Sequence, residues 1–210
     1  MNITIFGASR GVGRAAVAIA ASHGHTVTAV ARTAAALAGQ PATALAGNVL
    51  DAGFVARSLA GAEAVIVALG TDPSARGDEQ QTHVCSRGTR VILDAMRAPL
   101  VRIVVVSSYG IGPTRANRPF PFNVIAATLL KEVMADKEIQ EQIVRESEKE
   151  WTIAQPLGLT DAPATGRPLV TTNGRRGGTR VSRADVATVC VDALDQGRYL
   201  RETIAISASS

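Results

Sequence analysis

The chain has 210 residues, 46% hydrophobic, 19% charged and 3% aromatic, which suits a single globular domain with a core of Ala, Val, Ile and Leu. The formal net charge is +4, but the arginines are scattered without a basic helix or a set of stacking aromatics, so we predict no nucleic-acid partner and attribute the charge to solvation and an anionic cofactor. No secretory signal or membrane-length apolar stretch is visible, so we expect a cytoplasmic protein with no membrane partner. Cys85 and Cys190 lie far apart without metal-ligand spacing, so we expect no disulfide framework and no metal site.

Strands and helices alternate along the first half of the chain. The pattern predicts strands at 2–6, 26–31, 42–46, 64–70 and 101–108, and helices at 12–22, 51–59 and 79–97, the second capped by Asp51. Such alternation is typical of βαβ units. The expected fold class is therefore α/β, a Rossmann-type doubly wound parallel sheet with helices on both faces.

The second half is less regular. Its pattern predicts a loop at 109–121, a long helix at 122–148, a strand at 151–155 and a loop at 156–168. Short strands are then predicted at 169–172 and 179–181, on either side of an Asn-Gly turn. A capping box of Ser182 and Asp185 opens a helix that runs to Leu194, and a last strand is predicted at 202–207. We expect one NAD(P)-binding domain over 1–210, with a small C-terminal substrate lobe built from segments near 109–121 and 156–181.

A glycine-rich turn follows the first predicted strand and opens the first helix. Its residues are Gly7, Ala8, Ser9, Arg10, Gly11, Val12 and Gly13. Gly7 permits the tight turn, Gly11 lets the backbone approach a pyrophosphate, and Gly13 permits close packing of helix on strand. Free N–H groups at the helix start would bind the anion. The alternative is a plain strand–helix turn, in which three glycines cost stability without a ligand.

The end of the second strand predicts which nicotinamide cofactor is preferred. NAD-preferring enzymes place Asp or Glu there, whereas this chain has Arg32, and a second arginine, Arg10, lies in the glycine turn. Two guanidinium groups could bind a 2′-phosphate that an acid would repel, which favours NADP (as NADPH). The alternative is that Arg32 is an exposed arginine that stacks on the adenine.

Together these motifs resemble the short-chain dehydrogenase/reductase superfamily. The motifs that resemble the superfamily are GASRGVG at 7–13, Gly47-Asn48-Val49 and Leu69-Gly70-Thr71. The motifs that are similar to its atypical branch, which holds biliverdin/flavin reductase-like and NmrA-like proteins, are VVVSS at 104–108, WTI at 151–153 with Gln155-Pro156, and VSRADVA at 181–187. The resemblance implies cofactor contacts from Asn48, Val49, Leu69, Gly70, Thr71 and Ser107, and from Pro156, Leu157 and Gly158 facing the nicotinamide.

One departure from that superfamily bears on the chemistry. Most catalytic members carry Tyr-x-x-x-Lys, in which the tyrosine protonates a carbonyl, but here Pro113 follows Tyr109 at that spacing and Thr203 follows Tyr199. Sugar epimerisation and ordinary alcohol oxidation are therefore disfavoured. A flavin or an extended tetrapyrrole can accept hydride with a proton supplied by solvent, so a strong built-in acid is less necessary.

The remaining candidates for catalysis are Ser108, Tyr109 and Lys137. The first two end the fifth strand, where such sheets bind ligands; a serine could orient a substrate carbonyl and Tyr109 could donate a proton. Alternatively the serines cap backbone groups and Tyr109 packs the loop. Lys137 either faces the pocket, as polar residues do in related proteins, or pairs with Glu141 on the helix surface. His83 and Trp151 are interpreted as structural.

The sequence thus favours an NADPH-dependent reductase that transfers hydride to a small conjugated acceptor such as a flavin, quinone or tetrapyrrole. The alternative is a non-catalytic NADP(H)-sensing regulatory protein of the NmrA-like type. A monomer and a homodimer are both compatible with the sequence.

Overall fold

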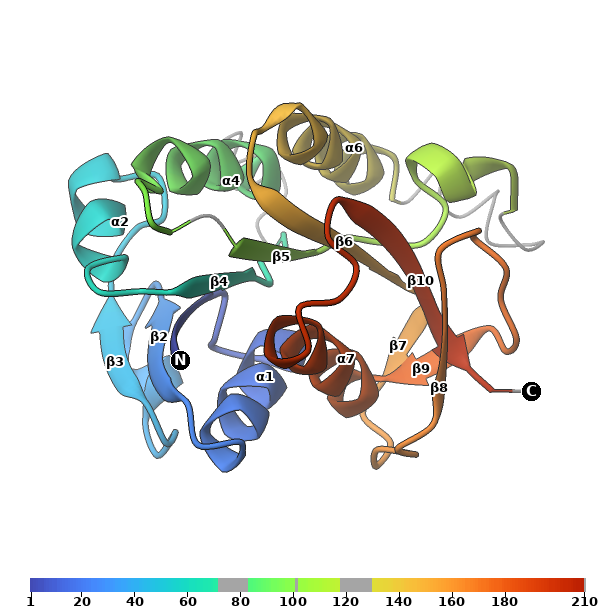
Figure 1. Ribbon diagram of the computed structural model, residues 1–210, viewed down its shortest axis with the longest axis horizontal. Coiled ribbons are helices and arrows are strands. Elements are labelled where there is room, and N and C mark those ends of the chain that lie inside the picture. The colour runs from blue at the N-terminus through green and yellow to red at the C-terminus, as the bar shows by residue number, and fades with distance from the viewer. Residues whose placement is uncertain (72–82, 101, 118–129, 210) are drawn as a thin grey trace.

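In the computed structural model, residues 1–71, 83–100, 102–117 and 130–209 are described. Eight strands form one sheet in the order β3-β2-β1-β4-β5-β6-β10-β8 (Figure 1). Their bounds are β1 Asn2–Phe6, β2 Thr26–Ala31, β3 Thr43–Ala46, β4 Ala64–Val67, β5 Arg102–Val106, β6 Glu150–Pro156, β8 Pro168–Thr171 and β10 Glu202–Ala208. All neighbours pair in parallel except β10 and β8.

A second, small sheet lies in the C-terminal part of the chain. It pairs β7 (Gly158–Thr160) with β9 (Arg180–Ser182) in parallel. The Rossmann-type doubly wound sheet with a small C-terminal addition is therefore confirmed.

Helices cover both faces of the large sheet (Figure 1). One face carries α1 (Gly11–Ser22) and α7 (Arg183–Asp195), and the other carries α2 (Ala52–Ser58), α4 (Val84–Ala95) and α6 (Lys131–Glu146). Each layer has its own apolar core against the sheet. The central strands β4 and β5 are buried along their whole length, which explains their continuous Val and Ile runs.

The helix starts follow the predicted capping. Asp51 accepts a hydrogen bond from the Phe54 N–H at the start of α2, and Ser182 accepts one from the Asp185 N–H at the start of α7. Of the predicted helices at 79–97 and 122–148, residues 79–82 and 122–129 lie outside the described part, and the described helices span 84–95 and 131–146.

Two local predictions in the second half are wrong. A 3-10 helix, Gly112–Asn117, lies in the expected loop at 109–121, of which residues 118–121 are outside the described part, and β7 lies within the expected loop at 156–168. The short strands expected at 169–172 and 179–181 are present as β8 and β9. They do not pair with each other: β8 pairs with β10 and β9 with β7, partners set by the tertiary structure.

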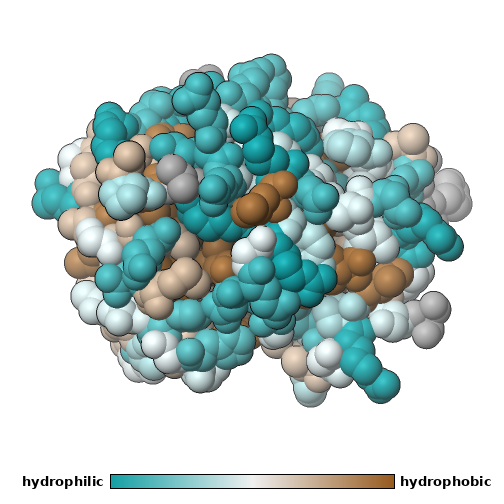
Figure 2. Space-filling view, viewed as in Figure 1, coloured by the Kyte–Doolittle hydropathy of each residue, from teal (hydrophilic) through white to brown (hydrophobic). Residues whose placement is uncertain are grey.

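The molecular face in Figure 2 is largely hydrophilic, with small and separate hydrophobic areas. Within the described ranges, no helix combines the length and apolar character needed to cross a membrane.

Candidate functional site

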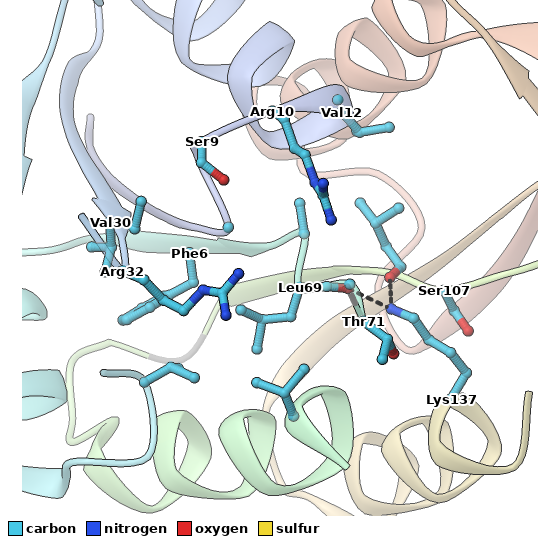
Figure 3. Close-up of a pocket in the computed structure, with 18 of the residues that line it drawn as sticks. Phe6, Ser9, Arg10, Val12, Val30, Arg32, Leu69, Thr71, Ser107 and Lys137 are labelled. Atoms are coloured by element: carbon cyan, nitrogen blue, oxygen red, sulfur yellow. Dashed lines mark hydrogen bonds between the residues drawn. The ribbon is translucent and has the colours of Figure 1, made fainter. Parts of the chain in front are cut away.

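A cavity of about 850 Å³ lies where the first strands of the sheet end (Figure 3). It brings together most of the residues singled out from the sequence: Gly7, Ser9, Arg10, Gly11, Val12, Arg32, Asn48, Val49, Leu69, Gly70, Thr71, Ser107, Ser108 and Lys137. These residues come from the segments that follow β1 to β5, from the start of α1 and from α6. The position matches the general rule that open α/β sheets bind ligands outside the carboxyl ends of their strands.

The glycine turn has the geometry that its sequence predicts. Gly7 has a φ of +82°, and a Cβ there would lie 2.4 Å from the Ala68 carbonyl oxygen. A Cβ on Gly13 would lie 2.2 Å from the Gly7 carbonyl oxygen, so α1 packs against the turn only because this residue is glycine. Gly11 differs, since its φ of +59° is the main constraint and a Cβ there would meet only the Arg183 side chain, at ordinary contact distance.

The N-terminus of α1 opens onto this cavity. Arg10 is the N-cap, but its side chain makes no capping hydrogen bond, and the first turn holds no acidic residue. No carboxylate of the first helical turn therefore compensates the partial positive charge at the start of α1 or accepts hydrogen bonds from its first N–H groups. This arrangement favours the binding of an anion such as a pyrophosphate at the start of α1.

Positive charge dominates the described lining of the cavity. Its ionisable side chains there are Arg10, Arg32, Arg183 and Lys137, and none of the described lining residues is Asp, Glu, His, Cys or Tyr. Figure 3 shows Arg10 and Arg32 pointing into the cavity. This environment suits a polyanionic ligand.

Arg183 is a lining residue that the sequence analysis did not single out. It begins α7, 172 residues beyond Gly11, yet a Cβ on Gly11 would lie 3.5 Å from its Nε atom. Its Nη1 donates to Asp161 Oδ1 at 2.9 Å. Only the VSRADVA motif offered a signal, and nothing local in that motif indicates contact with the glycine turn.

Lys137 is buried and faces the cavity. Its ammonium donates to the carbonyl oxygens of Leu69 at 2.9 Å and Val106 at 2.8 Å (Figure 3). It also donates to Gln140 Oε1 at 3.0 Å. The surface pair with Glu141 is absent, since Glu141 contacts Arg145 and accepts a hydrogen bond from Gln155. All three ammonium protons are used, so Lys137 holds the ends of β4 and β5 to α6.

Two hydroxyl groups at the cavity have no hydrogen-bond partner in the described part of the chain. Ser107 Oγ and Thr71 Oγ1 are both buried and unpaired among the described residues, although buried hydroxyls are nearly always hydrogen-bonded. Both belong to residues that line the cavity. Unsatisfied polar atoms of this kind fit a ligand with its own donors and acceptors, as the amide and phosphates of a nicotinamide dinucleotide provide.

Asn48 is held in place by its own turn. Its Oδ1 accepts a hydrogen bond from the Leu50 N–H at 3.0 Å, and the residue lines the cavity beside Val49. This contact uses the carbonyl half of the amide, so the NH₂ half is the one available to an adenine edge.

The structure does not bring every predicted residue to the cavity. Tyr109 is 3% exposed, is absent from the lining, and donates its hydroxyl proton to the Gly174 carbonyl oxygen at 2.8 Å. Burial raises the pKa of this phenol, against an opposing effect of Arg176. Tyr109 therefore packs the C-terminal lobe, which was the alternative to a proton donor.

The segment predicted to face the nicotinamide is also displaced from the lining. Pro156, Leu157 and Gly158 make backbone hydrogen bonds to Tyr109, Ile206 and Thr179, and the residue that reaches the cavity from this segment is Leu159. These contacts tie the segment to Tyr109 after β5, to β10 and to the residue before β9. The sequence analysis missed β7, which begins at Gly158.

The two side chains interpreted as structural lie outside the cavity. Trp151 is buried in the core beneath α4 and α6. His83 precedes α4 with its Nδ1 3.8 Å from Asp136 Oδ1, while the Asp136 carboxylate accepts hydrogen bonds from the Cys85 and Ser86 N–H groups.

Comparison with known proteins decides the family. The chain matches the family described as NAD(P)H-binding over residues 7–197. The chain belongs to this family of atypical short-chain dehydrogenases/reductases. It is thereby an NAD(P)H-binding protein of an oxidoreductase family, and the resemblance inferred from its motifs is confirmed.

Several solved structures resemble the chain over nearly its whole length. The anaerobilin reductase ChuY of Escherichia coli O157:H7 has 25% identity and a TM-score of 0.82, with 99% of this chain and 97% of that chain covered. A Burkholderia pseudomallei protein described as exported has 26% identity, a TM-score of 0.79 and 99% coverage of both chains. A Bacillus halodurans protein named as an NAD-dependent epimerase/dehydratase shares the fold at 20% identity and a TM-score of 0.83, with 100% and 95% covered.

Proposed function

We propose that the protein is an NADPH-dependent reductase that transfers hydride to a conjugated small molecule such as a flavin, a quinone or a tetrapyrrole. The observation that carries this proposal is the chemistry of the described cavity lining: four cationic side chains, two serine hydroxyls at the end of β5, and no carboxylic acid, histidine or tyrosine. Similarity at 25% identity to a protein named as an anaerobilin reductase supports the tetrapyrrole class.

NADPH fits the residues that are present. The glycine turn and the start of α1 would hold the pyrophosphate, Arg10 and Arg32 the 2′-phosphate, and Asn48 the adenine. The hydroxyls of Thr71 and Ser107 would satisfy polar atoms of the nicotinamide half, which removes the cost of burying them unpaired. When bound, the reduced nicotinamide supplies a hydride, that is, two electrons and one proton.

The protein's own residues orient the acceptor and leave its protonation to solvent. Ser108 is half-buried at the cavity and can donate a hydrogen bond to a polar acceptor atom, while Arg183 offers a positive charge opposite the glycine turn. Lys137 keeps the ends of β4 and β5 in register through its three hydrogen bonds. A conjugated acceptor spreads the incoming charge, so it reacts without the strong acid that a simple ketone requires.

The proposal is tested by NADPH oxidation with FMN, riboflavin, quinones, a bilin and simple ketones. We expect turnover with at least one conjugated acceptor and none with ketones. Ser108→Ala should lower turnover about tenfold or more through loss of one positioned hydrogen bond. Ser22→Ala, at an exposed serine bonded to Ile19 at the far end of α1, serves as the matched control. Efficient ketone reduction would contradict the proposal.

The preference for NADPH over NADH is tested separately. Arg32→Glu should cost about 1.5–3 kcal/mol of NADPH binding free energy, the range for a charged hydrogen bond, and leave NADH binding much less affected. Arg90→Glu, an exposed arginine on α4 outside the cavity lining, is the control. Equal affinity of the wild-type protein for both cofactors would show that these arginines do not select the phosphate.

A second candidate function is a non-catalytic NADP(H)-sensing protein. It is favoured by the same absence of a proton donor in the described lining, together with the full engagement of the Lys137 ammonium. NADPH binding without oxidation by any acceptor in the panel would decide for the sensor.

A further inference from the structure

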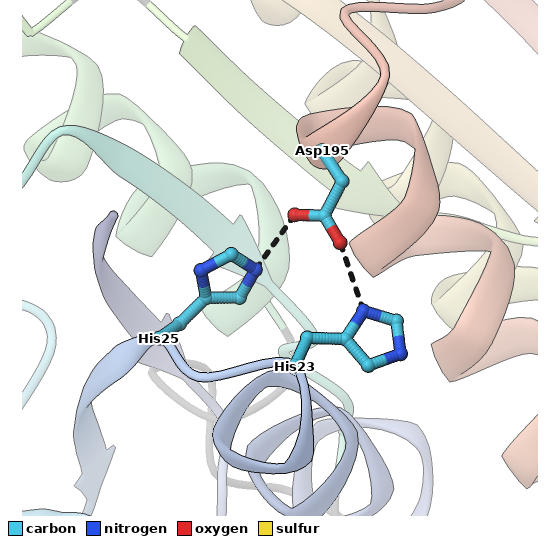
Figure 4. Close-up of side chains that lie close together, drawn as sticks. All are labelled: His23, His25 and Asp195. Carbon is cyan, nitrogen blue, oxygen red and sulfur yellow. Dashed lines mark hydrogen bonds and ion pairs between the residues drawn. The ribbon is translucent and has the colours of Figure 1, made fainter.

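Three side chains from distant parts of the chain meet on the molecular surface (Figure 4). His23 Nδ1 lies 2.8 Å from Asp195 Oδ2, and His25 Nε2 lies 2.6 Å from Asp195 Oδ1. The two imidazoles thus approach separate oxygens of one carboxylate. The two histidines are 172 and 170 residues from Asp195 in the sequence, so no local spacing pattern could have revealed the cluster.

The backbone on which these side chains stand is well defined. His23 closes α1 with its N–H bonded to the Ile19 carbonyl, and the His25 N–H bonds to the Ala20 carbonyl just before β2 begins. Between them Gly24 has a φ of +82°, the left-handed conformation that ends a helix. Asp195 is the last residue of α7, which packs directly on α1. The ligand atoms therefore stand on the end of α7 and on the short turn between α1 and β2 rather than on a long loop.

Two imidazole nitrogens and one carboxylate oxygen form a donor set that binds zinc. The three candidate ligand atoms all lie within 4.8 Å of one another. Tetrahedral zinc with bonds of about 2.0–2.1 Å places its ligand atoms roughly 3.3 Å apart, so small side-chain rotations would close the site. The side chains of His23, His25 and Asp195 are 35%, 11% and 24% exposed, which leaves room for water as a fourth ligand.

We propose that His23, His25 and Asp195 form a binding site for a divalent transition-metal ion, with Zn²⁺ as the best match. The ion would replace the protons that the two ring nitrogens now share with the carboxylate, and would join the end of α1 to the end of α7. Nitrogen ligands disfavour Mg²⁺ and Ca²⁺, which prefer all-oxygen sites. The cofactor cavity lies at the other end of α1, about 18 Å away for a 12-residue helix, so the two sites are separate.

The test is a calorimetric titration with Zn²⁺ of untagged protein from which a chelator has removed any metal. Co²⁺ bound in place of Zn²⁺ reports tetrahedral coordination through its visible absorption spectrum. We expect one equivalent to bind at protein concentrations on the order of 10 μM. His23→Asn and His25→Gln keep an amide near the position of the nitrogen that faces Asp195, so the hydrogen bonds can persist while the metal ligand is lost. Each should weaken Zn²⁺ binding at least about tenfold.

His83→Gln is the matched control, because His83 is the third and last histidine of the chain and lies outside the cluster. It should bind Zn²⁺ as the wild type does, and all variants should keep their NADPH affinity. Failure of the wild type to bind Zn²⁺, or equal binding by His23→Asn and His25→Gln, would overturn the proposal and leave the cluster as a hydrogen-bonded contact between α1 and α7.

Discussion

The hydroxyl of Tyr109 donates a hydrogen bond to the carbonyl oxygen of Gly174 at 2.8 Å. Gly174 has a φ of +72° and lies in the turn after β8, so this bond ties the end of β5 to the C-terminal lobe. Tyr109 also packs against Leu157 and Ala205 in a small apolar cluster. The tyrosine nearest the catalytic end of the sheet is therefore a structural residue.

Tyr109→Phe should change reductase turnover less than about twofold and lower the free energy of unfolding by about 0.5–1.5 kcal/mol, the net value of one hydrogen bond. The ring contacts remain, whereas the bond to Gly174 is lost. Initial rates and urea denaturation measure the two effects. A tenfold loss of turnover in a fully stable variant would instead return Tyr109 to the reaction.

Lys137→Met should destabilise the protein and impair the cofactor site together. The variant keeps much of the apolar stem but leaves the buried Val106 carbonyl oxygen without its Lys137 donor, at about 1–3 kcal/mol, and leaves the Leu69 carbonyl oxygen with the Cys85 thiol as its donor. NADPH affinity and thermal unfolding are the measurements. Lys131→Met, at an exposed lysine of the same helix, is the control. Unchanged stability in Lys137→Met would mean that these hydrogen bonds contribute nothing net.

Two alanine substitutions should separate binding from folding within the glycine turn. Gly11→Ala should fold, at a cost of about 1–2 kcal/mol for its positive φ, and should bind NADPH much more weakly because the new methyl group would stand beside the Arg183 side chain at the turn proposed to hold the pyrophosphate. Gly13→Ala should damage the fold itself, since its Cβ would lie 2.2 Å from a backbone oxygen. Circular dichroism and NADPH fluorescence distinguish the two. The assignment fails if the order of severity for folding is reversed.

Asp185 should make stability depend on acid. Burial raises the pKa of its carboxyl, but hydrogen bonds from Thr165, Ser182 and Gly166 outweigh burial and hold this pKa below the usual value. A depressed folded-state pKa means that the carboxylate stabilises the fold above its unfolded pKa of about 3.9, and that this contribution is lost as the pH falls through the lower folded-state value.

Asp185→Asn should therefore lower the free energy of unfolding at neutral pH by about 1–3 kcal/mol, and the gap to the wild type should narrow below about pH 4. Urea denaturation between pH 7 and pH 3 measures both. Asp94→Asn, at an exposed position on α4, should show no such convergence. A constant gap across this range would exclude the carboxylate as its cause.

The parts of the fold that were predictable depend on local chemistry. The glycine turn, the caps at Asp51 and Ser182, and the buried Val and Ile runs each carry their signal within a few residues, so the sheet and the cofactor end of the site followed from them. The roles of Lys137 and Arg183 did not, because each depends on contacts with elements far along the chain. Tyr109 was misplaced for a related reason: strand order locates a residue at the sheet edge but does not give the direction of its side chain.

The interior place of β10 has a consequence for how the protein is made. This strand lies between β6 and β8, and β8 bonds within the large sheet to β10 alone. On the ribosome β8 emerges before β10. Until β10 has been synthesised, the backbone N–H and C=O groups of β8 therefore lack the strand with which they pair in this sheet. We expect the N-terminal βαβ units to condense first and the C-terminal lobe to become resistant to proteases only after synthesis has passed β10.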